Sequence, residues 1–144
     1  MPCCNIWDKF NESKNLIREY KYWKLLVRNS NFTLGNCVVI NKRHLGSLSE
    51  VTPEEMAELA QIAREIEPSL KKSFSYDNIH WLLLMNHEKH IHFHIIPRYS
   101  RDKEFAGVIW KDPVWPSLIK SEIKQPPASQ ETLNQIKKEI LKNF

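Results

Sequence analysis

The sequence contains only three glycines and three cysteines among its 144 residues, and it has no long hydrophobic run. Two cysteines, Cys3 and Cys4, are adjacent, and three cysteines do not form a disulfide framework, so we expect a reducing compartment, the cytoplasm. The longest apolar run, Trp81 to Met85, is far shorter than the roughly 18 residues that cross a membrane. The N-terminus lacks the charged head and apolar stretch of a secretory signal. We therefore expect no association with a membrane.

The sequence also has no large excess of one charge, because it contains 21 basic and 17 acidic residues and its net charge is only +4. A nucleic-acid-binding protein needs clustered positive charge. Here the basic residues are dispersed, with short groups at Lys42–Arg43, Lys71–Lys72 and Lys137–Lys138. The charge pattern predicts no specific nucleic-acid partner, but it suits a small anionic substrate.

The chain is long enough for one compact domain with a core and too short for two. Residues 20–27 and 37–40 are rich in aromatic and β-branched residues, which predicts a pair of strands joined by a turn. Residues 79–85 form a nearly continuous apolar run, typical of a central strand buried on both faces. Residues 90–96 follow after a short turn, so we expect an antiparallel partner strand that ends at Pro97.

A helix is predicted from residue 53, because Thr52 and Glu55 form the T-x-x-E pattern of a capping box and Pro53 suits the first helical position. We expect Pro68 to kink or restart this helix. Its apolar stripe is predicted to comprise Met56, Leu59, Ala60, Ala63, Ile66 and Leu70.

Residues 101–128 are expected to form an extended tail, and Ser129 is expected to cap a last helix over residues 129–144. Together the expected elements give the α+β class: a single antiparallel sheet of about five strands with helices packed beside it.

Three histidines, His90, His92 and His94, are spaced by two residues. In a strand this spacing places all three on one face, with neighbours roughly 6.6 Å apart along the strand. A phosphate can sit over the middle imidazole with the outer two beside it, whereas three nitrogens about 2 Å from one metal ion are awkward in a single row. The spacing alone leaves open phosphate chemistry, metal binding and a solvent-facing strand with no function.

The segment His90-Ile91-His92-Phe93-His94-Ile95-Ile96 resembles the H-φ-H-φ-H-φ-φ signature of the histidine-triad (HIT) superfamily, where φ is hydrophobic. Pro97-Arg98-Tyr99 follows, as in many bacterial members. The predicted strand pair and the capped helix also fall in the family's order, so the resemblance covers roughly residues 20–100. It implies a single HIT domain over residues 1–144, similar to a small prokaryotic branch of the family.

This resemblance implies a metal-independent nucleotide hydrolase or nucleotidyl transferase, with hydrolysis favoured and no cofactor. His92 would attack the α-phosphorus and form a covalent nucleotidyl-histidine, while His90 and His94 would orient the site and donate hydrogen bonds. The substrate would be a nucleoside phosphoramidate, a dinucleoside polyphosphate or another nucleotide conjugate. A homodimer is expected from the family alone.

The sequence also departs from the family pattern. Asn36 stands where many members have a fourth histidine, and it could still donate to a phosphate. Asn86, with Lys89 behind it, is the best substitute for the family's phosphate contacts, and Arg28 or Asn29 lies where the family contacts the ribose.

The adjacent cysteines replace the Cys-x-x-Cys of zinc-containing members, so no structural zinc is expected. His44 is predicted to be a separate surface histidine, His80 a core or edge residue and His87 a turn residue. A nucleobase slot could be lined by Ile6, Trp7 or Leu26.

Two other functions are compatible with the histidine row. One is a metal-dependent enzyme that uses all three histidines as ligands, and the other is a non-catalytic nucleotide-binding scaffold. The sequence does not define the base, the leaving group or the acceptor of the transferred nucleotide.

Overall fold

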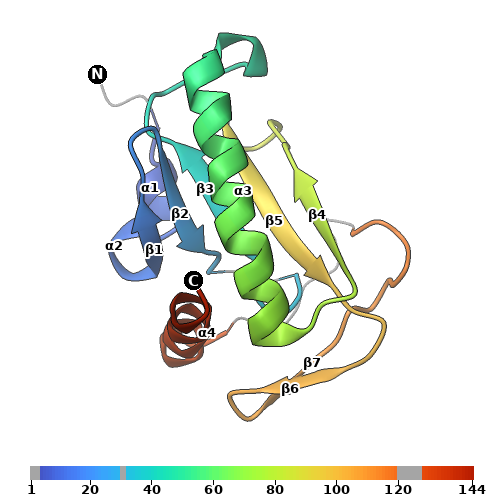
Figure 1. Ribbon diagram of the computed structural model, residues 1–144. Coiled ribbons are helices and arrows are strands. Elements are labelled where there is room, and N and C mark those ends of the chain that lie inside the picture. Colours follow the sequence, from blue (N-terminus) through green and yellow to red (C-terminus); the bar gives the residue numbers. More distant parts are fainter. Residues whose placement is uncertain (1–3, 30–31, 120–127) are drawn as a thin grey trace.

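The computed structural model describes residues 4–29, 32–119 and 128–144. Its centre is a five-stranded antiparallel sheet in the order β1-β2-β3-β5-β4 (Figure 1). The sheet strands are β1 (Leu16–Glu19), β2 (Trp23–Val27), β3 (Cys37–Asn41), β4 (Asn78–Leu82) and β5 (His92–Arg98). The expected α+β class with an antiparallel sheet of about five strands is confirmed.

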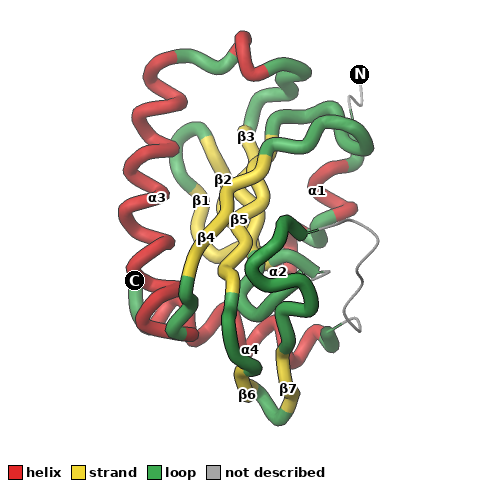
Figure 2. Tube along the Cα trace, turned by 90° about the vertical axis from the view of Figure 1, so that its right-hand side faces the viewer, coloured by secondary structure: helices red, strands yellow, loops and turns green. Residues whose placement is uncertain are grey.

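The helices lie on both faces of this sheet, as the view in Figure 2 shows from the side. The long helix α3 covers one face and the short helix α1 covers the other. No helix among the described residues is long and apolar enough to span a membrane. The helices are α1 (Ile6–Lys9), α2 (Glu12–Asn15), the 3-10 helix η1 (Leu48–Glu50), α3 (Pro53–Phe74) and α4 (Gln130–Lys142).

Helix α3 begins as the sequence predicts, with a complete capping box between Thr52 and Glu55. It then runs without a break through Pro68, contrary to the expected restart. Pro68 is exposed, so the carbonyl that lacks its N–H partner can bind water. The buried stripe also differs from the expected one, because Met56 and Ala60 are exposed. The residues buried along α3 are Glu55, Leu59, Ile62, Ile66, Ser69, Leu70 and Phe74.

Two apolar clusters hold the layers together, one on each face of the sheet. The larger joins α3 and α4 to the face that carries Leu25, Val39 and Ile95. The smaller joins Ile6 and Phe10 of the N-terminal segment to the opposite face; its sheet residues are Leu26, Val38 and Ile40. Since burial of each large aliphatic side chain contributes about 1.5–3 kcal/mol, the larger cluster dominates folding.

The strands near the histidines differ from the prediction in position. β4 covers residues 78–82 only, and it is a partly exposed edge strand rather than a central one. Its neighbour β5 is central and extends through Pro97 to Arg98. Pro97 is tolerated because it lies beyond the last β3–β5 pair, Cys37 with Ile95, where β5 pairs with β4 alone.

Residues 101–128 are less extended than expected, since β6 (Lys103–Phe105) and β7 (Val108–Trp110) form a small hairpin. Ala106 and Gly107 turn it with positive φ angles. Asp112 then bonds the buried guanidinium of Arg98 at 2.5 and 3.0 Å, which fastens the following segment to the end of β5. Residues 120–127 lie outside the described part of the chain. Ser129 caps α4 as predicted.

Candidate active site

The triad lies on the sheet face covered by α1. In the β3–β5 register, Ile40 pairs with His92 and Val38 pairs with His94. Both imidazoles contact the ring of Phe10, with ring centres 5.8 and 6.2 Å away. His92 and His94 therefore lie on the same sheet face as the smaller apolar cluster and border it at Phe10.

His92 is held in one tautomer by the backbone. Its Nδ1 donates to the carbonyl oxygen of His90 at 2.7 Å, because a carbonyl only accepts hydrogen bonds. His90 lies just before β5 and in turn donates from Nε2 to the carbonyl oxygen of Asn41 at 2.6 Å. Nε2 of His92 consequently has a free lone pair when the imidazole is neutral.

All three triad imidazoles are biased toward the neutral form. Burial is the largest cause and lowers the pKa of His90 and of His92 below 6.5. Burial, together with the positive charge of Arg28, lowers the pKa of His94 to about 3. His94 also has a buried Nδ1 that has no hydrogen-bond partner among the described residues. At neutral pH the site thus presents uncharged imidazoles, one of them with an unused ring nitrogen.

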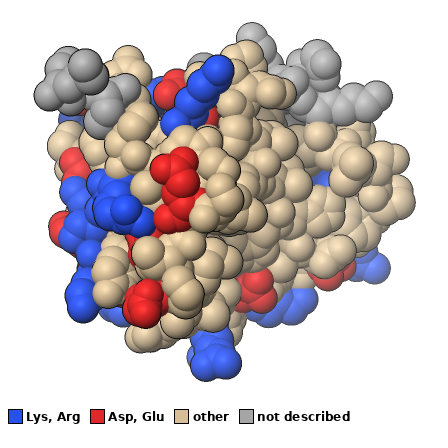
Figure 3. Space-filling view, turned by 90° about the horizontal axis from the view of Figure 1, so that it is seen from above, with Lys and Arg blue, Asp and Glu red and all other residues tan. Residues whose placement is uncertain are grey.

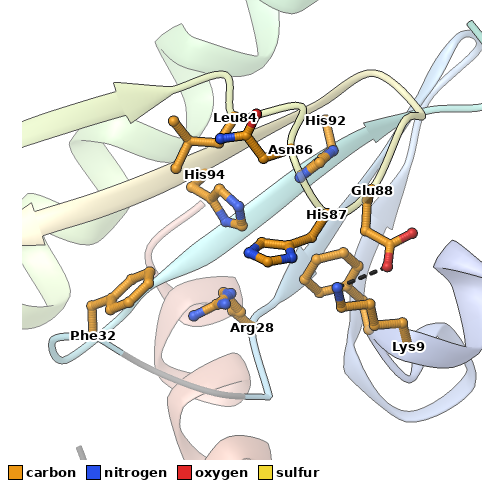
Figure 4. A pocket seen from close by; sticks show the side chains of 10 residues that line it. Lys9, Arg28, Phe32, Leu84, Asn86, His87, Glu88, His92 and His94 are labelled. Carbon is orange, nitrogen blue, oxygen red and sulfur yellow. Dashed lines mark hydrogen bonds and ion pairs between the residues drawn. The ribbon is translucent and has the colours of Figure 1, made fainter. Parts of the chain in front are cut away.

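A cavity of about 190 Å³ opens beside His92 and His94 (Figure 4). One wall is β5, and another is the loop between β4 and β5, which contributes Leu84 and Asn86. The remaining walls come from α1 and from the β2–β3 connection. An ion pair of 2.8 Å between Lys9 and Glu88 joins α1 to the loop at one side of the cavity. The lining residues are Lys9, Phe10, Arg28, Phe32, Leu84, Asn86, His87, Glu88, His92 and His94.

Four residues were expected to contact substrate, and the structure brings two of them to the cavity. Arg28 and Asn86 line it. Asn29 does not, and its amide donates to the carbonyl of Lys9. Asn36 is fully buried, and its amide donates to the carbonyls of Cys37 and Ile95. It therefore stabilises the start of β3 and does not line the cavity.

Five lining residues were not predicted as part of the site, because they come from short elements or loops with little sequence signal: Lys9, Phe10, Phe32, Leu84 and Glu88. Lys9 and Phe10 lie in and just after the four-residue helix α1, and Phe32 lies in a turn. His87, predicted as a turn residue whose nearness to the triad left a substrate contact open, also lines the cavity. The only sequence signal for these residues was that a basic and an aromatic residue lie close together, at Lys9 and Phe10 and again at Arg28 and Phe32.

A second cluster contains His90, and none of its residues lines the cavity. His44 is exposed at the surface, as expected, but it is not separate from the triad, since its Nδ1 is 3.2 Å from Nδ1 of His90. The sulfur of Cys4 is 3.3 Å from the same atom. The candidate ligand atoms of these three residues lie within 4.8 Å of one another.

This cluster fits a zinc ion chemically, because thiolate and imidazole are the ligands that zinc prefers. His90 already donates its other ring nitrogen to Asn41, which is the usual support of a metal-bound imidazole. Cys4, His44 and His90 are therefore the residues that could hold a metal, and a bound ion would fix the ring of His90. His92 and His94 do not belong to the cluster.

Charge on the molecular surface is mixed. Figure 3 shows basic and acidic side chains interspersed on one face, with wide uncharged areas between them. On that face no block of positive charge resembles a nucleic-acid groove. Positive charge is also present in the cavity, whose lining includes Lys9 and Arg28.

The sequence of residues 9–101 matches the model of the HIT domain, which covers well over half of the chain. This chain belongs to the HIT family. The matched segment includes β5 with His92 and His94 and most of the walls of the cavity. No curated protein sequence matches this HIT protein significantly.

Solved structures confirm the fold of this HIT protein at low sequence identity. A histidine-triad protein from Sinorhizobium meliloti has 21% identity and a TM-score of 0.74, covering 92% of each chain. A histidine-triad nucleotide-binding protein from Sulfolobus tokodaii has 20% identity and a TM-score of 0.72, covering 97% of this chain and 91% of the other. A diadenosine triphosphate hydrolase from Plasmodium falciparum has 15% identity and a TM-score of 0.62, covering 90% and 75%.

Proposed function

We propose that this HIT protein hydrolyses or transfers nucleotides through a covalent nucleotidyl-His92 intermediate, with hydrolysis favoured. The observation that carries the proposal is the bond from Nδ1 of His92 to the carbonyl of His90, beside a cavity that His92 lines. This bond leaves Nε2 as the nucleophile of a neutral imidazole. The substrate is a nucleoside phosphoramidate, a dinucleoside polyphosphate or another nucleotide conjugate, attacked at its α-phosphorus.

The two chemical steps balance without an external oxidant or reductant. In the first, Nε2 of His92 forms a bond to phosphorus while the bond from phosphorus to the leaving group breaks, and the leaving group departs with that electron pair and takes a proton from solvent, which the attacking water or acceptor returns in the second step. The imidazole then carries positive charge, which the carbonyl of His90 stabilises through Nδ1–H. In the second, water or another acceptor attacks phosphorus, loses a proton and displaces His92 as the neutral imidazole.

The lining residues supply hydrogen-bond donors for the anionic substrate. We assign Arg28 and Asn86 to substrate binding, because both line the cavity and both carry N–H donors. The uncharged imidazoles of His90 and His94 assist by orientation and hydrogen bonding. Diadenosine triphosphate hydrolase activity in the Plasmodium relative supports the dinucleoside polyphosphate class.

The decisive experiment traps the covalent species. The protein is incubated with labelled adenosine-5′-phosphoramidate or diadenosine polyphosphate, quenched with base and mapped by mass spectrometry. We expect the label on His92, no label in His92→Ala, and normal labelling in His80→Gln, a histidine outside the cavity. Turnover that survives His92→Ala would show that the covalent mechanism is incorrect, and the absence of turnover and label in the wild type would favour a non-catalytic scaffold.

The metal-dependent alternative has less support from the geometry. Among the described residues, the group suited to a metal ion contains His90 with Cys4 and His44, and not His92 or His94. We therefore expect turnover to survive a chelator within about twofold. Loss of turnover on chelation, restored by added metal, would instead favour metal catalysis.

The same proposal includes a homodimer in the cytoplasm. An exposed edge strand, β4, followed by Leu84 at 51% exposure, offers a surface on which two copies could pair. Cys4 and Cys37 are not joined in a disulfide, which suits a reducing compartment. Sedimentation at micromolar concentration should give about twice the 17.1 kDa of one chain, and a species of 17.1 kDa would contradict the dimer.

A further inference from the structure

The loop between β4 and β5 forms one wall of the cavity and is fixed at both ends. At its start, Leu82 pairs with His94 in the β4–β5 ladder. At its end, the backbone N–H of Ile91 donates to the carbonyl of Leu45 at 2.9 Å, and the carbonyl of Ile91 accepts from the backbone N–H of Asn41 at 3.1 Å. Any movement of this wall is therefore confined to the residues between these anchors.

The middle of the loop, residues 86–89, has little attachment to the rest of the molecule, and we call it the flap. Three of its four residues are exposed, whereas Met85 just before it packs against the larger apolar cluster. Among the described residues, the flap makes one hydrogen bond, the ion pair of 2.8 Å between Glu88 and Lys9 that Figure 4 shows as a dashed line. This pair is therefore what holds the flap in its place beside the cavity.

Lys9, the other partner of the pair, belongs to a well-anchored part of the molecule. Its backbone N–H donates to the carbonyl of Asn5 within α1, and its carbonyl accepts from the side-chain amide of Asn29 at 2.9 Å. The next residue, Phe10, is 3% exposed and packs in the smaller apolar cluster. The ion pair thus ties a loosely held loop to a fixed helix.

The cavity behind this pair is small for the proposed ligand. Its volume is about 190 Å³, whereas sites for small organic ligands usually have roughly 300–1,000 Å³. Of its walls, β5 is a central strand of the sheet and α1 is anchored through Lys9 and Phe10. Outward movement of the flap is therefore the smallest change that enlarges the cavity.

Electrostatics also favour an open pair when an anionic substrate binds. Burial lowers the pKa of His92, and the charge of Glu88 acts in the opposite direction, so this carboxylate is close enough to influence the nucleophile. A phosphate in front of His92 would be repelled by it. The pair is also easy to open, because an ion pair with Lys9 at 43% and Glu88 at 16% exposure shifts an equilibrium by only about 1.5- to 5-fold.

We propose that the Lys9–Glu88 ion pair holds the flap closed beside the triad, and that nucleotides bind only when this pair is open. The inference rests on the proposed function, because it takes the ligand of the cavity to be a nucleotide. If closed molecules do not bind, the apparent association constant is that of the open form multiplied by the open fraction. Loss of either partner should then raise the open fraction, and loss of both should raise it no further.

The test measures equilibrium binding by calorimetry with two ligands of different charge. One is AMP, and the other is adenosine 5′-sulfamate, in which an uncharged group replaces the phosphate. The proteins are the wild type, Lys9→Met, Glu88→Gln and the double variant, each verified as folded by thermal melting. The control is Glu65→Gln, which removes a similarly exposed ion pair of 2.9 Å with Arg18 outside the cavity.

For the uncharged ligand, we expect both single variants to bind about two- to fivefold more tightly than the wild type. The double variant should bind no more tightly than either single variant, and Glu65→Gln should match the wild type. With AMP, the lost charges also act directly on the ligand and in opposite directions. The double variant should still bind AMP about two- to fivefold more weakly than the product of the two single effects, because both changes open the same pair.

The outcomes separate this inference from the function on which it rests. Unchanged or weaker binding of the sulfamate in either single variant would overturn the inference alone, as would single effects that multiply in the double variant. If the wild type binds AMP and not the sulfamate, the AMP measurements decide by the same criterion of multiplication. Failure of the wild type to bind either ligand would overturn the proposed function and the inference with it.

Discussion

His92 donates Nδ1–H to the carbonyl oxygen of His90 across 2.7 Å, and His90 donates Nε2–H to the carbonyl of Asn41 across 2.6 Å. The two bonds form a short series in which each imidazole is oriented by the backbone rather than by a carboxylate. Because a carbonyl has no proton to give, the bond favours the tautomer of His92 that carries its proton on Nδ1.

The activity should depend on pH through the neutral form of His92. Burial lowers the pKa of His92 below its usual 6.5, so the unprotonated nucleophile stays populated at pH 6.5 and is lost only at lower pH. A profile of kcat/KM between pH 4 and 8, with a phosphodiester substrate that does not titrate in this range, should show an acid limb with its midpoint below 6.5. A midpoint above 6.5 would show that His92 is stabilised as a cation instead.

Glu55 should stabilise the fold through a polar network next to the triad. It is 1% exposed and accepts hydrogen bonds from Arg43, from the Asn41 side chain and from the backbone N–H of Thr52. We expect Glu55→Gln to lower the free energy of unfolding at pH 7 by about 2 kcal/mol, because a charged acceptor and one arm of the capping box are lost. Denaturant unfolding measures this, with Glu54→Gln on the exposed face as the control.

The effect of Glu55→Gln should also depend on pH with a defined sign. The hydrogen bond from Arg43 is the largest cause that lowers the pKa of Glu55, from 4.5 to about 2. A lowered carboxyl pKa contributes stability that is present above pH 4.5 and is lost as pH falls toward 2. The difference between wild type and variant should therefore shrink over that window, and a difference that grows on acidification would contradict the assignment.

Asp112 should be needed to keep Arg98 buried at the end of β5. Both side chains are at most 1% exposed, and the carboxylate meets the guanidinium through two bonds. Replacing Asp112 by Asn removes the counter-charge of a buried cation, which we expect to lower stability by about 3–5 kcal/mol. Asp102→Asn, at an exposed carboxylate, should change stability by less than about 0.5 kcal/mol in the same thermal or denaturant unfolding experiment. Equal effects of the two changes would mean that the Arg98 pair does not stabilise the fold.

Gly35 and Gly107 offer a matched pair for testing backbone and packing effects separately. Both have positive φ, 82° and 73°. A methyl group on Gly35 would lie 2.8 Å from Cδ2 of Phe74, whereas one on Gly107 would meet nothing within 4 Å. Gly107→Ala should lower stability by about 1 kcal/mol from strain alone, and Gly35→Ala by about 2–4 kcal/mol from strain and overpacking. Similar losses in the two variants would show that Phe74 moves aside freely.

The sequence predicted the features that depend on local or periodic signals. The capping box at Thr52, the start of α4 after Ser129 and the shared face of His92 and His94 follow from residue type and spacing, whereas His90 lies before β5 begins. The sequence-based prediction was wrong where tertiary packing decides. The apolar residues of β4 indicated a central strand, but the order of strands in the sheet places β4 at an edge. Pro97 inside β5 is a similar case, because its tolerance depends on where β3 ends.

The site was predictable to the same extent. The period of two selected the histidines of β5, but no local pattern could bring Lys9, Phe32 and His44 next to them from distant parts of the chain. The roles predicted for Asn36 and Arg28 came from their positions along the sequence. Only the three-dimensional packing shows that the Asn36 amide is used by backbone carbonyls while Arg28 faces the cavity.

The two apolar clusters on opposite faces of the sheet have a consequence for how such a protein can diverge. The larger cluster, beneath α3 and α4, supplies most of the buried apolar surface, while the cavity walls other than β5 come from a four-residue helix, the β2–β3 connection and the β4–β5 loop. Exchanges at Lys9, Arg28 or Asn86 can therefore alter ligand preference with little penalty to folding. The residues that stabilise the fold and most residues that line the cavity thus lie on different elements. Related proteins with the same core can therefore differ in substrate through a few replacements in the cavity lining.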